Sequence, residues 1–154
     1  AMLRSMKPGP MILQEARADQ RKISTPEDCA RILAPWARAA QEHFFALPLD
    51  TKNRFLGIDP EPVTVGIVDA TLVHPREIFR GAIVKNGAAI VLAHNHPSGD
   101  PAPSAEDIRV TRQLIEAGRV MDIRILDHVI LGASEQGICP RFVSLREEGI
   151  CEFS

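Results

Sequence analysis

Three side chains of the types that bind divalent metals lie close together in the second half of the sequence. His94 and His96 are separated by one residue and follow the apolar run 88–93. If that run is a strand, both imidazoles project from one face, because side chains alternate along a strand. Asp107 falls in the predicted first turn of a helix, from which its carboxylate can turn back towards the histidines. Three protein ligands and an open fourth position are typical of a catalytic zinc site.

The segment that joins the histidines to the aspartate is rich in proline and glycine, which shape and stiffen a loop. Ser104 is a typical N-cap, and Asp107 suits the capping box of the same helix. Capping alone would explain this pair, and a His-x-His pattern also arises by chance. The complete string HNHPSGDPAPSAED, however, places three ligands and a stiff loop after a buried strand. It therefore favours a metal site over these simpler explanations.

Hydrolysis at such a site also requires a group that moves protons. A bound zinc ion lowers the pKa of its water to about 7, and a base must then lie within hydrogen-bond reach. The pattern of residues leaves four glutamates open: Glu42, Glu61, Glu77 and Glu106. Glu106 points about 100° around the helix from Asp107, and the helix dipole explains Glu77 adequately. Glu42 stands just before an apolar strand, where a carboxylate can reach across the end of a sheet.

Two other groups of polar residues have two interpretations each. Asp127 and His128 either lie beside the metal or form a strand-end turn with a satisfied histidine, and we favour the structural interpretation. His74 and Arg76 either shape the site or mark the entry to a helix. Pro75 explains that entry by itself, because proline suits the first helical position.

Helical and strand patterns alternate along the chain. A capping motif at 24–28 predicts a helix over 26–34 followed by a short helical piece, and further helices are expected over 75–86 and 105–117. The expected strands are 43–49, 54–58, 63–68 and 88–93, with a last strand or strand pair over 123–126 and 128–131. A hairpin turn is expected at 50–53. This order predicts an α/β domain with a mixed central sheet flanked by helices.

The whole chain has the composition of one globular domain, with 154 residues, 45% hydrophobic and 25% charged. We expect residues 1–23 to form a flexible arm and residues 24–154 to form the domain. No apolar run approaches the roughly 20 residues of a membrane span, and no signal peptide is recognisable, so a cytoplasmic protein is expected. The three cysteines show no CxxC spacing, which argues against a disulfide scaffold or a cysteine zinc site.

The charge of the chain gives little support to nucleic-acid binding. The net charge is −2, so no global basic field exists. A local basic patch is an alternative in the predicted arm, but we favour a flexible, solvated tail there; the residues are Arg4, Lys7, Arg17, Arg21 and Lys22. DNA binding is thus possible but not supported by charge, and the oligomeric state is left open.

The central motif resembles the JAMM (MPN+) metalloprotease signature, which is a glutamate, His-x-His, seven residues, and Ser-x-x-Asp. The spacing from His96 to Ser104 and Asp107 matches it without adjustment. The surrounding sequence resembles the RadC family more closely still, in the segments VHPRE, AHNHPSGDP, LDH and FVSLREEG. The resemblance runs from about residue 24 to the end of the chain.

Membership of this family would imply a JAB/MPN domain related in architecture to cytidine deaminases. Zinc would be held by the residues that match the motif, His94, His96 and Asp107. Glu42 precedes the first strand as the signature glutamate does, and would act as general base and then proton donor. Ser104 would help to bind the carbonyl oxygen as it becomes an oxyanion.

The resemblance makes a JAMM-type zinc hydrolase the leading hypothesis, in which a metal-activated water attacks an amide or isopeptide bond. The substrate would be a peptide, an isopeptide or a small amide. The alternative is a DNA-repair-associated, DNA-binding factor with a structural or vestigial metal site, suggested by the family's repair association and the basic arm. A deaminase is disfavoured, because zinc deaminases combine H-x-E with P-C-x-x-C, whereas Asn95 and His96 follow His94 here.

Overall fold

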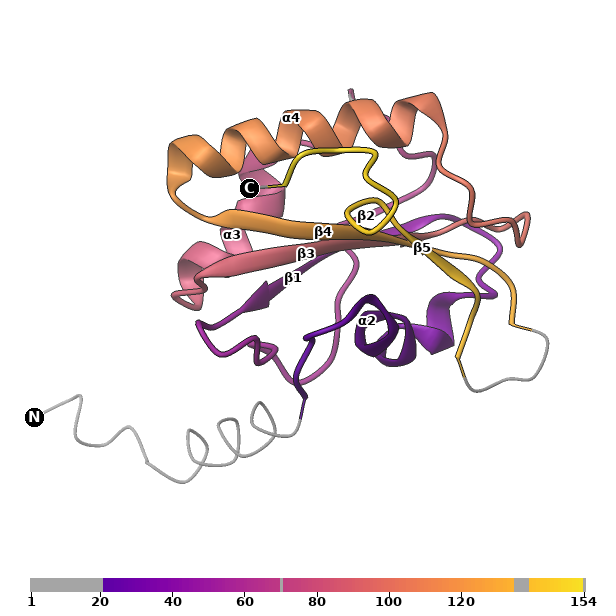
Figure 1. Cartoon of the computed structure of the whole chain (residues 1–154), viewed down its shortest axis with the longest axis horizontal. Coiled ribbons are helices and arrows are strands. Elements are labelled where there is room, and N and C mark those ends of the chain that lie inside the picture. The colour runs from indigo at the N-terminus through magenta and orange to yellow at the C-terminus, as the bar shows by residue number, and fades with distance from the viewer. Residues whose placement is uncertain (1–20, 70, 135–138, 154) are drawn as a thin grey trace, which may run out of the picture.

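A five-stranded mixed sheet forms the middle layer of the protein, as the computed structural model shows for residues 21–69, 71–134 and 139–153 (Figure 1). The strands lie in the order β2-β1-β3-β4-β5. Only β3 and β4 pair in parallel; the other neighbours are antiparallel. The strands are β1 (His43–Leu49), β2 (Thr64–Val65), β3 (Ala89–Asn95), β4 (Arg124–Leu131) and β5 (Phe142–Ser144).

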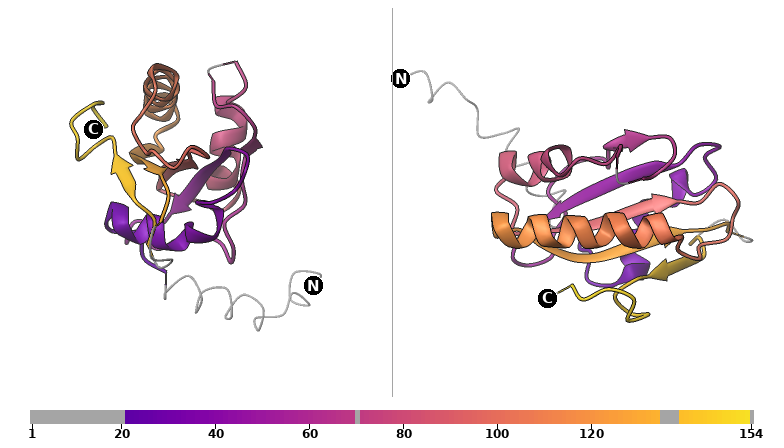
Figure 2. Two further views of the ribbon diagram at one scale, coloured as in Figure 1. Left: turned by 90° about the vertical axis from the view of Figure 1, so that its right-hand side faces the viewer. Right: turned by 90° about the horizontal axis from the view of Figure 1, so that it is seen from above.

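Helices cover both faces of this sheet. The longer helices α3 (Pro75–Val84) and α4 (Ala105–Met121) lie on one face, and α2 (Pro26–Ile32) with the short 3-10 helix η2 (Ala34–Trp36) lies on the other (Figure 2). Each face buries its own apolar cluster, one with Phe44, Phe79, Leu92 and Leu114, the other with Cys29, Leu33, Phe45 and Val91. The sequence prediction of an α/β domain with a mixed sheet flanked by helices is confirmed.

The central strand β3 determines where the predicted metal-binding histidines point. All seven of its residues are buried. Ile90 and Leu92 face α3 and α4, whereas Val91 and Ala93 face α2. The alternation continues to the end of the strand. His94 therefore joins the face covered by α4, and Asn95 joins the face covered by α2.

Two of the expected strands differ from the structure. Residues 54–58 form only isolated bridges, Lys22 with Arg54 and Leu49 with Phe55, so the prediction of a strand there was wrong. The strand expected over 63–68 is reduced to Thr64–Val65. The segment that returns beside β1 makes only two regular pairs with that strand before the chain turns away from the sheet. Strand β5, three residues long, was not predicted, because so short a segment shows no periodicity.

The helices and the last long strand also differ in extent from expectation. Helix α4 passes through Gly118, where a stop was predicted, and ends at Met121 with Asp122 in the left-handed conformation. Helix α3 ends at Val84, ahead of Gly87. The ranges expected as 123–126 and 128–131 form one strand, β4, which begins one residue later than expected, at Arg124. In the part of the chain that the structure describes, no helix combines the length and apolar character of a membrane span.

The boundary region between the expected arm and the domain is only partly described. Most of the range 1–23 lies outside the described residues. Its last three residues pair with the loop after β1: the Phe55 amide donates to the Arg21 carbonyl, and the Ile23 amide donates to the Asn53 carbonyl. Ile23 is buried against the α2 face of the sheet.

Candidate metal centre

The two histidines and the aspartate of the central motif meet at the end of β3. The Nε2 atoms of His94 and His96 lie 3.0 Å apart. The Asp107 carboxylate reaches both, with Oδ1 3.2 Å from His94 Nε2 and Oδ2 3.0 Å from His96 Nε2. His94 and Asp107 are buried, and the His96 side chain is 14% exposed. The group is thus open on the side of His96.

These three donors fit a divalent metal. Zinc binds imidazole nitrogen and carboxylate oxygen at about 2.0–2.2 Å, so donors at the corners of a tetrahedron lie roughly 3.3 Å apart. The separations in this structure, 3.0 to 3.2 Å, are close to that edge length. Two nitrogens and one oxygen are also a donor set that zinc accepts in catalytic sites.

Glu42 completes the cluster from β1. It is the last residue before that strand, and its carboxylate lies within 4.8 Å of the ligand atoms of His94 and His96. Its Oε2 accepts a hydrogen bond from the Val68 amide at 3.1 Å, and its carbonyl accepts one from the Gly66 amide. The loop after β2 therefore orients this carboxylate. Of the four glutamates that the sequence left open, Glu42 is the one that shares this cluster.

Asn95 fixes the backbone on both sides of Glu42 from the opposite face of β3. Its Oδ1 accepts the His43 amide at 2.7 Å, and its Nδ2 donates to the Gln41 carbonyl at 3.0 Å. The asparagine is fully buried, so these bonds are shielded from water. At the end of β3, His94 and His96 therefore point to one face. Asn95, between them in the sequence, points to the other face and holds the backbone of the segment that includes Glu42.

Ser104 lies at the start of α4, beside the metal ligands. The capping box predicted from the sequence is present: the Asp107 amide donates to Ser104 Oγ at 3.1 Å, and the Ser104 amide donates to Asp107 Oδ2 at 2.8 Å. Asp107 therefore serves the helix and the histidines with the same carboxylate. The Ser104 hydroxyl accepts one bond here and has a proton of its own to donate.

A backbone carbonyl orients the second histidine. His96 Nδ1 lies 2.9 Å from the Asp100 carbonyl oxygen, which can only accept, so Nδ1 carries a proton. The His96 amide also donates to the Leu131 carbonyl at the end of β4. When the ring is neutral, its Nε2 therefore presents a lone pair to Asp107 and His94. A metal-binding histidine usually donates a hydrogen bond in this way from the ring nitrogen that does not bind the metal.

His128 contacts the first histidine, although the sequence favoured a structural interpretation for the pair Asp127 and His128. His94 Nδ1 lies 2.8 Å from His128 Nε2, and His128 Nδ1 lies 2.5 Å from Thr111 Oγ1. Both His128 and Thr111 are fully buried. The interpretation was therefore wrong for His128. No signal in the sequence connects Thr111 to the site, because the contact depends on how α4 packs on β4.

Asp127 faces away from the candidate metal centre and matches the structural interpretation. Its carboxylate accepts the Ser144 hydroxyl at 2.5 Å, the His128 amide at 2.7 Å and the Arg146 amide at 3.1 Å. It thus ties β4 to the segment that includes β5. His74 occupies the N-cap position of α3 without a side-chain capping bond, and Arg76 is exposed on that helix.

The ionisable groups of the centre shift one another's pKa values. Burial opposes ionisation of Asp107, but hydrogen bonds from His94 and His96 outweigh it and hold its pKa well below the ordinary range. Burial also opposes protonation of His96, yet the Asp107 carboxylate and the Asp100 carbonyl raise its pKa above the usual value. For His128, burial and the neighbouring His94 both lower the pKa. Both effects favour the neutral form of the His128 imidazole.

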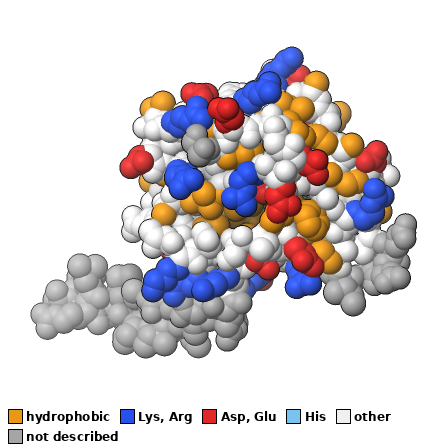
Figure 3. Space-filling view, in the orientation of Figure 1, with side chains coloured by type: hydrophobic (Ala, Val, Ile, Leu, Met, Phe, Trp, Pro, Cys, Tyr) orange, Lys and Arg blue, Asp and Glu red, His pale blue; other side chains and the backbone are white. Residues whose placement is uncertain are grey.

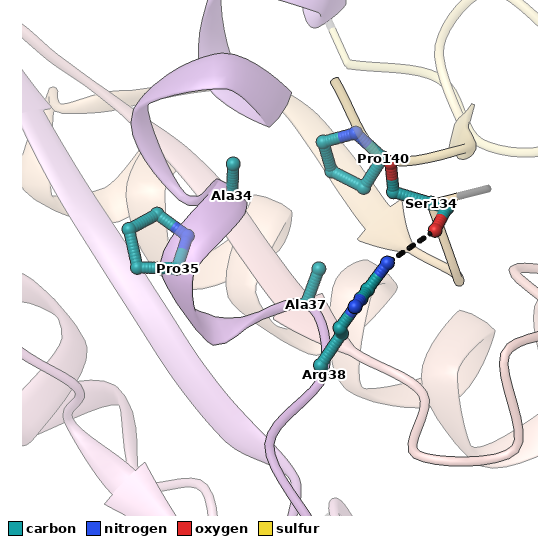
Figure 4. Close-up of a pocket in the computed structure, with 6 residues that line it drawn as sticks. All are labelled: Ala34, Pro35, Ala37, Arg38, Ser134 and Pro140. Carbon is teal, nitrogen blue, oxygen red and sulfur yellow. Dashed lines mark hydrogen bonds between the residues drawn. The ribbon is translucent and has the colours of Figure 1, made fainter. Parts of the chain in front are cut away.

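A separate surface pocket lies away from this centre, between η2 with the residues that follow it and the segment after β4 that includes Ser134 and Pro140 (Figure 4). Its lining residues are Ala34, Pro35, Ala37, Arg38, Ser134 and Pro140. The Arg38 guanidinium points into it and donates to the Ser134 carbonyl at 2.8 Å. None of the metal-site residues lines this pocket, so the chemistry of the centre does not extend into it.

Comparison with known proteins agrees with the sequence resemblance. The profile of the RadC-like JAB domain family matches residues 23–150. A UPF0758 protein of Methanococcoides burtonii is 47% identical over 131 residues, which are 84% of this chain and 54% of that protein. A UPF0758 protein of Bacillus cereus strain AH187 is 47% identical over 128 residues, or 82% and 53% of the two chains.

A more distant relative covers more of the chain. A UPF0758 protein of Caldanaerobacter subterraneus is 38% identical over 146 residues, which are 94% of this chain and 59% of that protein. The chain therefore spans about half the length of the curated relatives it matches. The match over residues 23–150 covers β1, β3, α4 and β4, the elements that carry the metal centre. On these grounds the chain belongs to the RadC-like JAB domain family.

Proposed function

We propose that this domain is a zinc-dependent hydrolase of the JAMM type, which cleaves an amide or isopeptide bond. The observation that supports it most is the convergence of His94, His96 and Asp107, with the Glu42 carboxylate within 4.8 Å of the histidine ligand atoms. Three donors of this kind leave one position of a tetrahedral zinc ion for water or substrate. A peptide, an isopeptide or a small amide is the proposed substrate.

Each residue of the centre has a defined task in this reaction. Zinc, when bound, supplies a Lewis acid that polarises the substrate carbonyl and makes water more acidic. Glu42 takes a proton from the water that attacks the carbonyl carbon, while the Val68 amide holds one of its oxygens. The Ser104 hydroxyl donates to the oxygen that becomes negatively charged. As the C–N bond breaks, Glu42 returns the proton to the leaving nitrogen.

The test of this proposal begins with metal content. Wild-type protein and the His94→Ala/His96→Ala double variant would be purified side by side without chelators and measured by plasma mass spectrometry. We expect about one zinc per wild-type chain and almost none in the variant, because three ligands are reduced to one. A wild-type protein that contains no metal, and takes up none from micromolar zinc, would contradict the proposal.

Replacing Glu42 by Gln separates chemistry from metal binding. We expect Glu42→Gln to keep its zinc and to lose about 10²–10⁴-fold in kcat on any peptide or isopeptide that the wild type cleaves, because the amide cannot accept the proton. Glu61→Gln removes an exposed carboxylate of the same type and serves as the matched control. Equal turnover by wild type and Glu42→Gln would show that Glu42 is not the base.

A DNA-binding role receives no specific support from the face drawn in Figure 3, where blue Lys and Arg side chains are interspersed with red Asp and Glu side chains. A protein that binds DNA through phosphates would show a steep loss of affinity with salt. If the wild type binds no zinc, and DNA binding with such a salt dependence is unaffected by His94→Ala, the hydrolase proposal would give way to this alternative.

A further inference from the structure

A closed ring of polar contacts connects two of the metal-binding residues through two others. It runs from His94 Nδ1 to His128 Nε2 at 2.8 Å, from His128 Nδ1 to Thr111 Oγ1 at 2.5 Å, and from Thr111 Oγ1 to the Asp107 carbonyl at 2.6 Å. Asp107 Oδ1 then returns to His94 Nε2 at 3.2 Å. We propose that His128 and Thr111 are positioning residues, which hold His94 in the tautomer whose Nε2 can bind a metal. This inference rests on the proposed zinc site.

The direction of the protons follows from the one member of the ring that cannot donate. The Asp107 backbone carbonyl only accepts, so the Thr111 hydroxyl gives it its single proton. The hydroxyl oxygen then offers a lone pair to His128, whose Nδ1 must carry the proton. His128 Nε2 is left as an acceptor for His94 Nδ1–H. When the His94 ring is neutral, as metal binding requires, its lone pair is therefore on Nε2, the atom that faces Asp107 and His96.

The opposite order of protons would disable the site. If Thr111 donated to His128 Nδ1, the second nitrogen of His128 would carry a proton and donate it to His94 Nδ1. A neutral His94 would then be protonated on Nε2 and could not bind a metal through that atom. The bond from Thr111 to the Asp107 carbonyl, a common contact of threonine with the carbonyl four residues earlier in a helix, selects the competent order.

Burial makes this selection effective. His94, Thr111 and His128 are fully buried, and Asp107 is 2% exposed. A nitrogen that loses its partner here therefore has no bulk water to replace it. Phe44 also restricts both rings, since it stacks on His94 with centroids 5.7 Å apart and meets His128 edge-on at 5.4 Å. The rings cannot turn freely to exchange partners.

A β-bulge brings His128 to this face of the sheet. The register between β3 and β4 shifts after Ile90, which pairs with Ile125, so that the next residue, Val91, pairs with Asp127. In a regular strand, Ile125 and His128 would point to opposite faces. The bulge places both on the α4 face, where Ile125 joins the core and His128 contacts His94. Bulges near functional sites commonly redirect a side chain in this way.

A matched pair of substitutions tests the contact with His94. The amide of His128→Gln reaches about as far as the ring Nε2, so it can still accept from His94. The amide of His128→Asn reaches only as far as Nδ1, so it keeps the Thr111 side of the ring and loses the His94 side. Zinc affinity would be measured by competition with a chromophoric chelator. We expect His128→Asn to lose about 10–100-fold in affinity and His128→Gln to stay close to wild type.

The same logic applies to Thr111. Thr111→Ser keeps the hydroxyl and should bind zinc as the wild type does, whereas Thr111→Val removes it and should bind more weakly. Far-UV circular dichroism and thermal unfolding of each variant would show whether it is folded. If the folded Asn, Gln and Val variants all bind zinc like the wild type, the positioning role is overturned, even though the zinc site itself stands.

Wild-type protein offers a measurement that needs no variant. Long-range ¹H–¹⁵N correlation spectra distinguish protonated, unprotonated and metal-bound imidazole nitrogens. In the zinc-loaded chain we expect His128 to be protonated on Nδ1 alone and His94 to be protonated on Nδ1 with Nε2 bound to zinc. A proton on His128 Nε2 would overturn the inference. A wild type that takes up no zinc would instead overturn the proposed function.

Discussion

Asp107 shows how one side chain can serve the local fold and the chemistry together. Its Oδ2 accepts the Ser104 amide as part of the capping box, and both carboxylate oxygens face the histidines. The capping bond fixes the rotamer of the aspartate before any metal is present. A site whose ligands are held in this way has less conformational entropy to lose on metal binding. The capping interpretation and the metal-site interpretation of this residue are thus compatible.

The pKa shifts of this pair predict how stability depends on pH without metal. The raised pKa of His96 means that its contribution to stability is full below the unfolded pKa of about 6.5 and is lost as pH rises through the higher folded value. The lowered pKa of Asp107 means that its contribution is present above about 3.9 and is lost in acid. The lowered pKa of buried His128 acts in the opposite sense up to its unfolded pKa of about 6.5. We therefore expect the free energy of unfolding, measured with urea in the presence of a chelator, to fall as pH rises from about 7 to 8.

His96→Gln is the control for this pH dependence. Glutamine does not titrate, so the variant should show a flatter profile over the same range. Parallel profiles for wild type and variant would mean that another group is responsible. Zinc should reverse the trend, because binding requires the unprotonated imidazole and therefore strengthens as pH rises.

Helix α4 is held against the sheet by a close backbone approach at Gly118. A Cβ added there would lie 2.5 Å from the Ile123 carbonyl oxygen. Alanine has the higher helix propensity, but this clash with backbone outweighs it. We expect Gly118→Ala to lower the free energy of unfolding by about 1–3 kcal/mol in urea denaturation.

The matched control lies on the neighbouring helix. A Cβ at Gly81 of α3 would meet nothing within 4 Å, so Gly81→Ala should stabilise the protein by about 0.5–1 kcal/mol. If both substitutions were stabilising, the close approach at Gly118 would not constrain the fold. The contrast also explains why a stop at Gly118 was a reasonable but wrong prediction: this glycine is required by packing, not by helix termination.

The loop that follows the histidines depends on a second glycine. A Cβ at Gly132 would lie 2.5 Å from the Gly99 carbonyl oxygen and 2.7 Å from Pro101 Cδ. The Ala133 amide also donates to the same Gly99 carbonyl. We expect Gly132→Ala to push this loop away from β4 and to reduce zinc affinity more than it reduces helix content by circular dichroism. Unchanged affinity would show that the loop can move without disturbing the ligands.

At the scale of the whole molecule, the metal centre joins elements from three parts of the chain. Glu42 immediately precedes β1, His94 and His96 lie at and just after the end of β3, and Asp107 lies in the first turn of α4. A ligand that binds only the folded protein stabilises it, by about 2.7 kcal/mol when its concentration is 100 times its Kd. We expect zinc to raise the Tm of the wild type in differential scanning calorimetry. The His94→Ala/His96→Ala variant should show no such shift, and a shift equal to that of the wild type would place the stabilising zinc elsewhere.

The sequence by itself determined the capped start of α4 and the class of fold, and it predicted the candidate metal ligands that the structure brings together. These features depend on local geometry: alternation along a strand brings His94 and His96 to one face, and the capping box aims Asp107. The apolar run 88–93 similarly identified the central strand. Strand and helix ends were less accurate, because pairing and packing beyond the local sequence decide them.

The family resemblance had already pointed to Glu42 among four glutamates, whereas only the tertiary structure showed that it lies beside the histidines and that His128 and Thr111 contact the site. Glu42 reaches the histidines because β1 pairs with β3 and Asn95 clamps the residues on either side of it. His128 faces His94 because a bulge changes the register between β3 and β4. Register between strands distant in sequence is set by the packing of both faces of the sheet at once, which no local pattern of residues encodes.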